Sequence, residues 1–224
     1  MVYSRTTPRQ RAWAQDAGRW LALGAVVAPI LFMLGAFLLA PTHPGYSIVR
    51  QQVSALAVGP HGELMRSLFL LYGVLVTVGT MAVFVGLRDE LGTISRWTCA
   101  ALLSLSPLGV LWCGVFTMDQ WTLHLIGVQV AFTPIVVTLP IAGLLLRRAP
   151  NWRRFGTLMI LGGPLTLGLI IGLVTSIPQS QMLTGGGTFG LWQRALGGEV
   201  FTWFVALGWL YFRHSRRAAA GSPK

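Results

Sequence analysis

Charged residues are scarce in this sequence. They make up 10% of its 224 residues, with six acidic residues and a single lysine, Lys224. A soluble domain carries roughly 25% charged residues, so the composition excludes an ordinary soluble protein. Cysteine is scarce as well: Cys99 and Cys113 fall in one predicted helix, about 21 Å apart along its axis, and cannot bridge each other. The Cys and Cys/His spacings of structural zinc sites are absent, and we predict no metal site and no cofactor.

Long apolar runs fill most of the chain instead. Hydrophobic residues make up 54% of it, and uncharged runs of about twenty residues recur, each long enough to cross a hydrocarbon core of about 30 Å. The sequence therefore predicts an all-α, polytopic membrane protein with one six-helix transmembrane domain over residues 20–213. The expected spans are about 20–40, 67–87, 97–118, 122–146, 155–178 and 191–212.

The last of these spans is inferred from a run that is too short. The uncharged run near the C-terminus extends only from Val200 to Phe212, which as a helix covers about 20 Å. The helix must therefore begin earlier, near Leu191. This start places Glu199 at membrane depth and Arg194 near the membrane boundary.

The basic residues predict the orientation. Fourteen Arg and Lys lie in segments 1–19, 88–96, 147–154 and 213–224, against three in the remaining connections. The positive-inside rule then places both termini in the cytoplasm, with 1–19 and 214–224 as basic cytoplasmic segments, in a prokaryotic plasma membrane. Topology also explains the net charge of +11, so the lipid bilayer is the expected partner and nucleic acid is not.

The first outer connection, residues 41–66, contains a short apolar stripe. Val49, Val53 and Leu56 recur at i, i+4 and i+7, which predicts a short amphipathic helix that lies on the outer surface or dips into it. Arg50 and Ser54 lie away from this stripe, so we expect them to face the bundle or the water.

The stretch from Gly114 to His124 is a polar break between the third and fourth spans, and we expect it to form a hairpin tip on the outer face. Asp119 and His124 lie five residues apart across this tip. A carboxylate that orients an imidazole suits general-base chemistry, and Ser54 on the neighbouring connection could act as the nucleophile. In the structural interpretation, Asp119 caps the following helix and His124 is a hydrogen-bonded interfacial residue.

Charges at membrane depth normally face a partner or a wet cavity. Arg194 and Glu199 are the expected mutual pair, although a spacing of five residues favours contacts with other helices as well. Arg50 and Tyr46 join them in the expected outer-face pocket, where Arg194 would hold an anionic group.

Three short motifs occur in order along the chain. They are Pro-Gly-Tyr46-Ser-x5-Val-Ser54-x-Leu56, Gly114-Val-Phe116-x-x-Asp119 with a following His124, and Gly190-Leu-Trp-Gln-Arg194. With these motifs the chain resembles the domain of unknown function 998 family, small prokaryotic membrane proteins with six spans, over about residues 18–213. The resemblance implies the fold and one shared site at Ser54, Asp119, His124 and Arg194, and it implies no activity. The Ser/Asp/His set also resembles the ceramidase-like membrane hydrolases, which need three metal-binding histidines where this bundle offers one.

Three functions stay open at this stage. The outer pocket binds a small polar molecule or a lipid headgroup, or His124, Asp119 and Ser54 catalyse lipid hydrolysis or transfer, or the polar groups only stabilise the bundle. An enzyme needs the Ser54 hydroxyl within hydrogen-bond reach of His124, directly or through water. The sequence leaves the oligomeric state open.

Overall fold

The computed structural model describes residues 16–181 and 184–220, which form an α-helical bundle without strands. Six helical segments are long and apolar enough to cross a membrane, as predicted. They cover Asp16–Thr42, Gly62–Asp89, Thr93–Val115, Met118–Leu146, Pro150–Thr175 and Phe189–Arg217. Residues 1–15 of the predicted basic segment 1–19 lie outside the described residues. Residues 221–224, at the end of the chain, lie outside them as well.

The helices within these segments have clear bounds. The α-helices are α2 (Gly24–Leu39), α3 (Gly62–Gly86), α4 (Thr93–Val115), α5 (Trp121–Phe132), α6 (Ile135–Leu146), α7 (Arg153–Thr175) and α8 (Phe189–Ala220). The 3-10 helices are η1 (Ala40–Thr42), η2 (Val53–Ala57), η3 (Leu87–Asp89), η4 (Met118–Gln120), η5 (Pro150–Trp152) and η6 (Gln179–Gln181). Helix α8 begins close to the predicted start and continues through residues 214–220.

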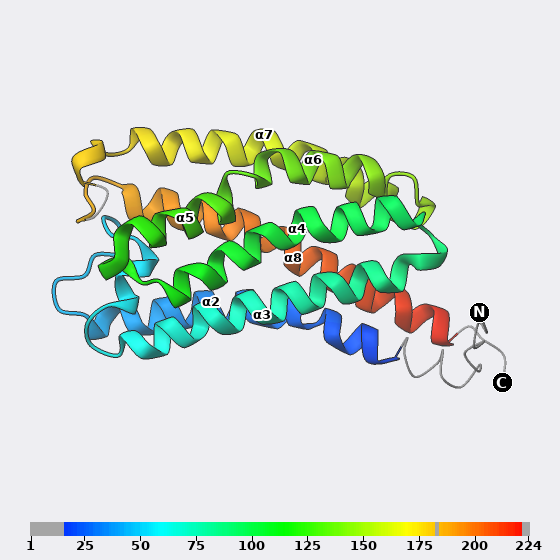
Figure 1. The fold of residues 1–224 in the computed structure, drawn as a ribbon, viewed down its shortest axis with the longest axis horizontal. Coiled ribbons are helices and arrows are strands. Elements are labelled where there is room, and N and C mark those ends of the chain that lie inside the picture. The colour runs from blue at the N-terminus through cyan, green and yellow to red at the C-terminus, as the bar shows by residue number, and fades with distance from the viewer. Residues whose placement is uncertain (1–15, 182–183, 221–224) are drawn as a thin grey trace.

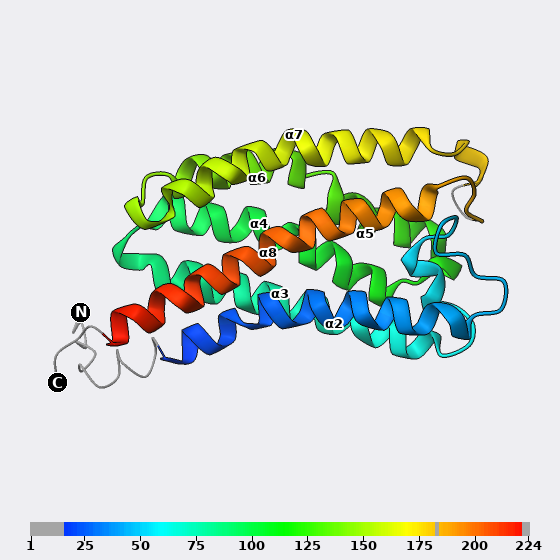
Figure 2. The same ribbon diagram turned by 180° about the vertical axis from the view of Figure 1, so that it is seen from behind.

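Consecutive helices pack as antiparallel neighbours, and the last helix ties them together. Helix α3 packs on α2 and α4, and α7 packs on α6. Helix α8 crosses the bundle obliquely and contacts α2, α3 and α7, as Figures 1 and 2 show from opposite sides. The described chain begins and ends at the same end of the bundle.

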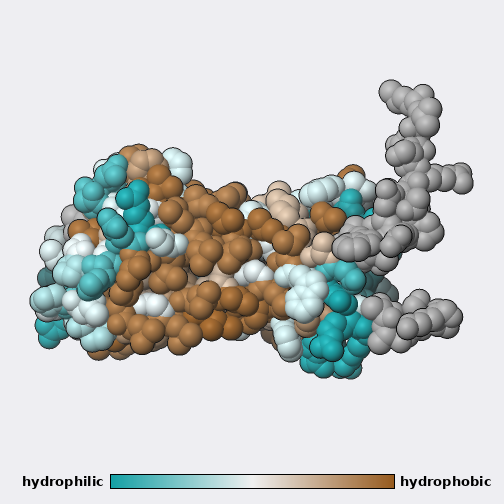
Figure 3. Space-filling view, turned by 90° about the horizontal axis from the view of Figure 1, so that it is seen from below, coloured by the Kyte–Doolittle hydropathy of each residue, from teal (hydrophilic) through white to brown (hydrophobic). Residues whose placement is uncertain are grey.

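We call that end the basic end; it includes residues 88–96, 147–154 and 213–217. The opposite end, with residues 43–61, 116–120, 176–181 and 184–188, is the loop end. In the face viewed in Figure 3, a broad hydrophobic band separates the two hydrophilic ends. Large apolar side chains are exposed on the membrane-length helices, including Leu38 on α2 at 73% and Leu161 on α7 at 64%. Such a surface is stable only against lipid, so the chain is a multi-pass membrane protein.

The fourth span is broken at Pro134. Helix α5 ends at Phe132 and α6 begins at Ile135. Proline has no N–H to donate and its ring clashes with the preceding turn, so a straight helix is not available here. The two halves pack differently, because α5 lies mainly on α4 and α6 lies mainly on α7. The break therefore lets α5 diverge from α7 toward the loop end.

The predicted helix in the first connection differs in kind and position. The chain turns at residues 48–50, and the short helix is η2, a 3-10 helix that begins at Val53. Its Val53, Ser54 and Leu56 are buried, because η2 packs inward against α2, α3 and α8. Val53 and Leu56 of the predicted stripe therefore face the bundle, whereas Val49 lies before η2 and is 42% exposed.

Glycines allow close helix contact at one crossing in particular. A Cβ atom at Gly109 in α4 would lie 2.6 Å from the Gly127 carbonyl oxygen in α5 and would overlap the backbone of Ala131. Helices α4 and α5 therefore touch backbone to backbone, as small residues permit in membrane bundles. Gly168 in α7, by contrast, has open space beside it.

We predict that Gly109→Ala destabilises the protein by about 1–3 kcal/mol, because the new methyl group must push α5 away from α4. Gly168→Ala is the matched control, and it should leave stability unchanged or slightly raised. Unfolding of both variants by denaturing detergent, followed by circular dichroism, measures the difference. Equal stability of the two variants would contradict the close crossing.

Candidate functional site

A tight hairpin at the loop end holds the first predicted site residues. Helix α4 ends at Val115, and η4 leads directly into α5. The Thr117 hydroxyl donates a hydrogen bond to the Asp119 carboxylate, and the Gln120 amide donates to the Thr117 carbonyl at 2.9 Å. Asp119 is exposed, and its hydrogen bond stabilises the turn. It makes no hydrogen bond or ion pair with His124, so the expected Asp119–His124 pair is not formed.

A backbone carbonyl orients His124 instead. The ring is 1% exposed, and Nδ1 lies 2.7 Å from the carbonyl oxygen of Phe116. A carbonyl only accepts hydrogen bonds, so Nδ1 carries a proton, and a neutral ring then has a lone pair on Nε2. Nε2 is buried and has no hydrogen-bond partner in the part of the chain that the structure describes. It is an oriented acceptor that the protein does not use.

A cavity of about 130 Å³ lies beside His124, between α5, α7 and α8 and next to η2. Its walls are mainly apolar, and its polar groups come from the first connection and the starts of α5 and α8. The lining residues are Gln52, Ser54, Trp121, His124, Leu125, Val128, Gln129, Phe132, Thr133, Ile170, Leu173, Val174, Phe189, Gln193 and Leu196.

The cavity reaches the lateral surface of the bundle. Gln129, Thr133 and Val174 are exposed on α5 and α7, where the two helices diverge. The Thr133 hydroxyl donates a hydrogen bond to the Gln129 side-chain oxygen at 2.6 Å, so these two polar groups pair with each other at the opening of the cavity. Among the lining residues that the structure describes, none is Asp, Glu, Lys or Arg. The cavity is thus accessible from the membrane and carries no formal charge besides any on His124.

Ser54 shares this cavity with His124. It is 5% exposed on η2, which contacts the hairpin tip, and both residues also line a smaller void of about 50 Å³ on the core side. No direct hydrogen bond joins the Ser54 hydroxyl to His124 within residues 16–181 and 184–220. The two predicted site residues therefore line the same two cavities.

Arg194 binds the first connection, and it also lines the smaller void of about 50 Å³ together with Ser54 and His124. Its Nη1 donates to the carbonyl oxygens of Ile48 at 2.8 Å, Gln51 at 2.9 Å and Gly190 at 3.0 Å. Its Nη2 donates to the Tyr46 hydroxyl at 2.5 Å, which in turn donates to the Gln52 carbonyl at 3.0 Å. Burial raises the pKa of the Tyr46 phenol, although Arg194 acts to lower it, so the hydroxyl stays protonated.

Glu199 lies apart from this group. The Thr166 hydroxyl on α7 donates to it at 3.0 Å, and the Trp203 indole N–H on α8 donates to its other oxygen. The prediction of an Arg194–Glu199 ion pair is therefore wrong, because each side chain forms its hydrogen bonds with uncharged groups. Arg50 is exposed at the loop end, and its guanidinium group makes no hydrogen bond or ion pair with the described residues, although its backbone bonds to Ser47 and Gly186.

Two cavity residues were missed from the sequence. Gln193 and Gln52 stand beside predicted residues within the family motifs, and both line the cavity. The Gln193 amide oxygen accepts from the Val53 amide at 2.7 Å, so it anchors η2 as well. The available signal for Gln193 was its specified position in the third motif, whereas Gln52 falls in the unspecified part of the first motif. The described residues contain no group of three His, Cys, Asp or Glu side chains that could hold a metal ion.

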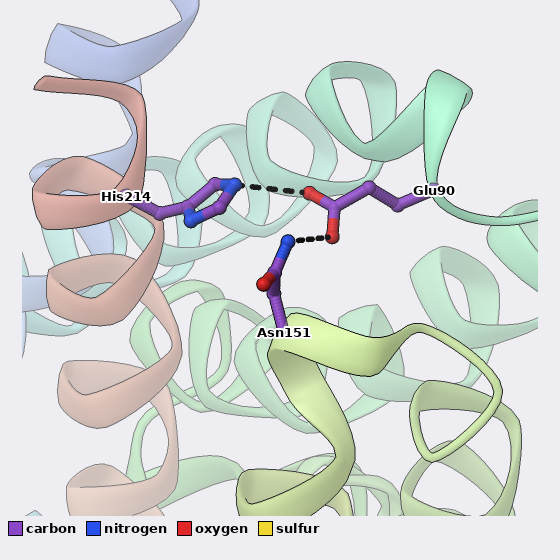
Figure 4. Close-up of polar contacts among 3 residues, drawn as sticks. All are labelled: Glu90, Asn151 and His214. Atoms are coloured by element: carbon purple, nitrogen blue, oxygen red, sulfur yellow. Dashed lines mark hydrogen bonds and ion pairs between the residues drawn. The ribbon is translucent and has the colours of Figure 1, made fainter. Parts of the chain in front are cut away.

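A second polar cluster, at the basic end, was also missed. The Glu90 carboxylate contacts His214 Nε2 at 3.2 Å and accepts a hydrogen bond from the Asn151 amide at 3.1 Å (Figure 4). These residues come from the connection after η3, from η5 and from α8. No local sequence pattern links residues so far apart.

The sequence model of one protein family matches residues 26–210, and its description is "Protein of unknown function (DUF998)". No curated protein and no solved structure matches the chain.

We predict that Arg194→Gln lowers the free energy of unfolding by more than about 2 kcal/mol, because it leaves several buried carbonyl oxygens without their charged donor. Arg50→Gln removes the same charge from the same end, where it has no partner, and should change stability by less than about 0.5 kcal/mol. Chemical unfolding in one detergent compares the two. If Arg194→Gln is as stable as Arg50→Gln, the role of Arg194 in holding the first connection is wrong.

Proposed function

Because this chain belongs to the DUF998 family of membrane proteins, whose description assigns no activity, we propose its function from the loop-end cavity. The protein binds an amphiphile whose uncharged head donates hydrogen bonds, such as a lipid with free hydroxyl groups. The unpartnered, buried Nε2 of His124 at the end of an apolar cavity is the observation that carries this proposal.

The cavity supports this class of ligand in three ways. Its apolar walls suit the first carbons of an acyl chain, and its lateral opening lets the rest of the chain remain in the membrane. His124 Nε2 accepts a hydrogen bond, so the complementary head is a donor. A charged head would lose hydration without gaining a counter-ion, because the nearest guanidinium, that of Arg194, is occupied by carbonyl oxygens.

We predict that the purified protein binds monooleoylglycerol, measured as adducts by native mass spectrometry, and that His124→Leu weakens this binding about tenfold through loss of a buried hydrogen bond. Thr122→Leu changes a polar residue of the same helix outside the cavity and should bind as the wild type does. Lysophosphatidylcholine with the same acyl chain should bind more weakly than monooleoylglycerol. Equal binding by the His124 and Thr122 variants would contradict the proposal.

A second candidate function is lipid hydrolysis, favoured by the common cavity of Ser54 and the oriented His124. In that reaction His124 Nε2 would take the proton of the Ser54 hydroxyl as it attacks an ester. The Phe116 carbonyl would then orient the ring in place of the expected Asp119. The absent Ser54–His124 hydrogen bond favours binding over hydrolysis.

A fluorophosphonate probe separates the two functions, because it reacts covalently with activated serines. We predict no adduct on Ser54, since its hydroxyl has no base in direct contact. The measurement is intact-protein mass spectrometry of the wild type, with Ser54→Ala as the control. An adduct that appears in the wild type and is lost in Ser54→Ala would favour the hydrolase.

A further inference from the structure

A separate cavity of about 220 Å³ opens at the basic end, far from the loop-end cavity. Two elements line it. Asn151 and Trp152 come from η5, just before α7, and Leu210, Arg213, His214 and Arg217 come from α8. Arg213 and Arg217 are one helical turn apart, so their side chains lie on the same face of α8.

The donors around this cavity are not used within the protein. The guanidinium groups of Arg213 and Arg217 make no hydrogen bond or ion pair with the residues that the structure describes. The Trp152 side chain is 2% exposed, and its indole N–H is buried without a hydrogen-bond partner among the described residues. An orphaned buried donor is costly, and it is normally explained by a bound water, an ion or a ligand.

The acidic group beside this cavity is the carboxylate of Glu90. The Glu90 carboxylate is engaged by His214 Nε2 and the Asn151 amide (Figure 4), and Glu90 does not line the cavity. It therefore fixes the positions of two lining side chains. The cavity itself offers two unpaired guanidinium groups and an indole donor around one volume.

We propose that this cavity binds a phosphate group. Guanidinium groups match the oxygen geometry of phosphate, and three converging donor side chains suit its several acceptor oxygens. The positively charged end of the α7 helix dipole lies beside η5 and adds to the attraction.

Two sources could supply the phosphate: the headgroup of an anionic phospholipid, or free phosphate. The charge bias predicts that this end faces the cytoplasm, where anionic headgroups are abundant. Leu210, which lines the cavity, is 38% exposed toward the lipid region and suits the start of an acyl chain. Both sources share the same chemistry at Arg213, Arg217 and Trp152.

The experiment measures binding of dioleoylphosphatidylglycerol, with dioleoylphosphatidylcholine for comparison, by native mass spectrometry of the detergent-purified full chain. We expect Arg213→Gln and Arg217→Gln each to weaken phosphatidylglycerol binding about tenfold. Arg216→Gln is the matched control: it removes the same charge from the adjacent position, but Arg216 lies over the Phe212 ring and does not line the cavity. It should weaken binding less than twofold.

A second variant tests the indole. Trp152→Phe keeps an aromatic ring in the core but removes the N–H, so it should weaken phosphatidylglycerol binding by severalfold while leaving the unfolding midpoint in phosphate-free buffer near that of the wild type. Inorganic phosphate, titrated against the thermal midpoint of the wild type, separates the sources. Stabilisation by phosphate supports a free-anion site, and stabilisation by phosphatidylglycerol alone supports a lipid site.

Two results would overturn the proposal. If Arg213→Gln, Arg217→Gln and Arg216→Gln all weaken binding equally, the attraction is diffuse and the cavity is not a site. If the wild type prefers neither phosphatidylglycerol over phosphatidylcholine nor phosphate over chloride, no phosphate site exists. Neither result depends on monooleoylglycerol binding at the loop end.

Discussion

The hydrogen bonds of Arg194 hold together the part of the structure on which the loop-end cavity depends. Beside a membrane, irregular backbone is stable only where its polar groups are satisfied by the protein. The first connection turns at residues 48–50 and leaves carbonyl oxygens at Ile48 and Gln51 that no helix can use. Arg194 on α8 donates hydrogen bonds to these two oxygens, and the neighbouring Gln193 side chain anchors the start of η2. Because η2 carries Ser54 to the cavity, the polar end of that cavity exists only while α8 holds the connection in place.

His124 shows that structural and functional interpretations of a buried polar residue need not be alternatives. Helix α4 ends at Val115, and the extended backbone of the next residue, Phe116, leaves the helix, so the Phe116 carbonyl needs a donor from elsewhere. His124 Nδ1 satisfies it and thereby turns Nε2 away from the hairpin. The structural hydrogen bond thus creates the free acceptor. Pro134 supplies the space, since the break after Phe132 lets α5 leave α7. A continuous fourth helix would close the opening through which an amphiphile could enter.

The sequence predicted what depends on local pattern and missed what depends on distant partners. The six spans follow from apolar runs, and the early start of α8 follows from the length that a membrane demands. The charge pairs failed because a charge was assumed to need an opposite charge. Arg194 instead binds carbonyl oxygens, and Glu199 accepts from a hydroxyl and an indole. Such partners are numerous in any helical bundle and leave no distinctive pattern. Glu90, which follows η3, meets His214 within α8 at the basic end, and predicting this contact requires knowing every span's length and tilt.

The uneven distribution of charge also separates the chemistry of the two ends. At the loop end the cavity has no charged lining residue in the described chain, and the adjacent guanidinium is occupied by carbonyl oxygens, so an anion placed there would lose its hydration without compensation. At the basic end Arg213 and Arg217 have no acidic partner, and Glu90 is held by His214 and Asn151. An anion in the loop-end cavity would be desolvated without a positively charged partner. An uncharged group in the basic-end cavity would leave the guanidinium groups of Arg213 and Arg217 without a negatively charged partner. The bias in charge that predicts orientation therefore also favours an uncharged head at one end and a phosphate at the other.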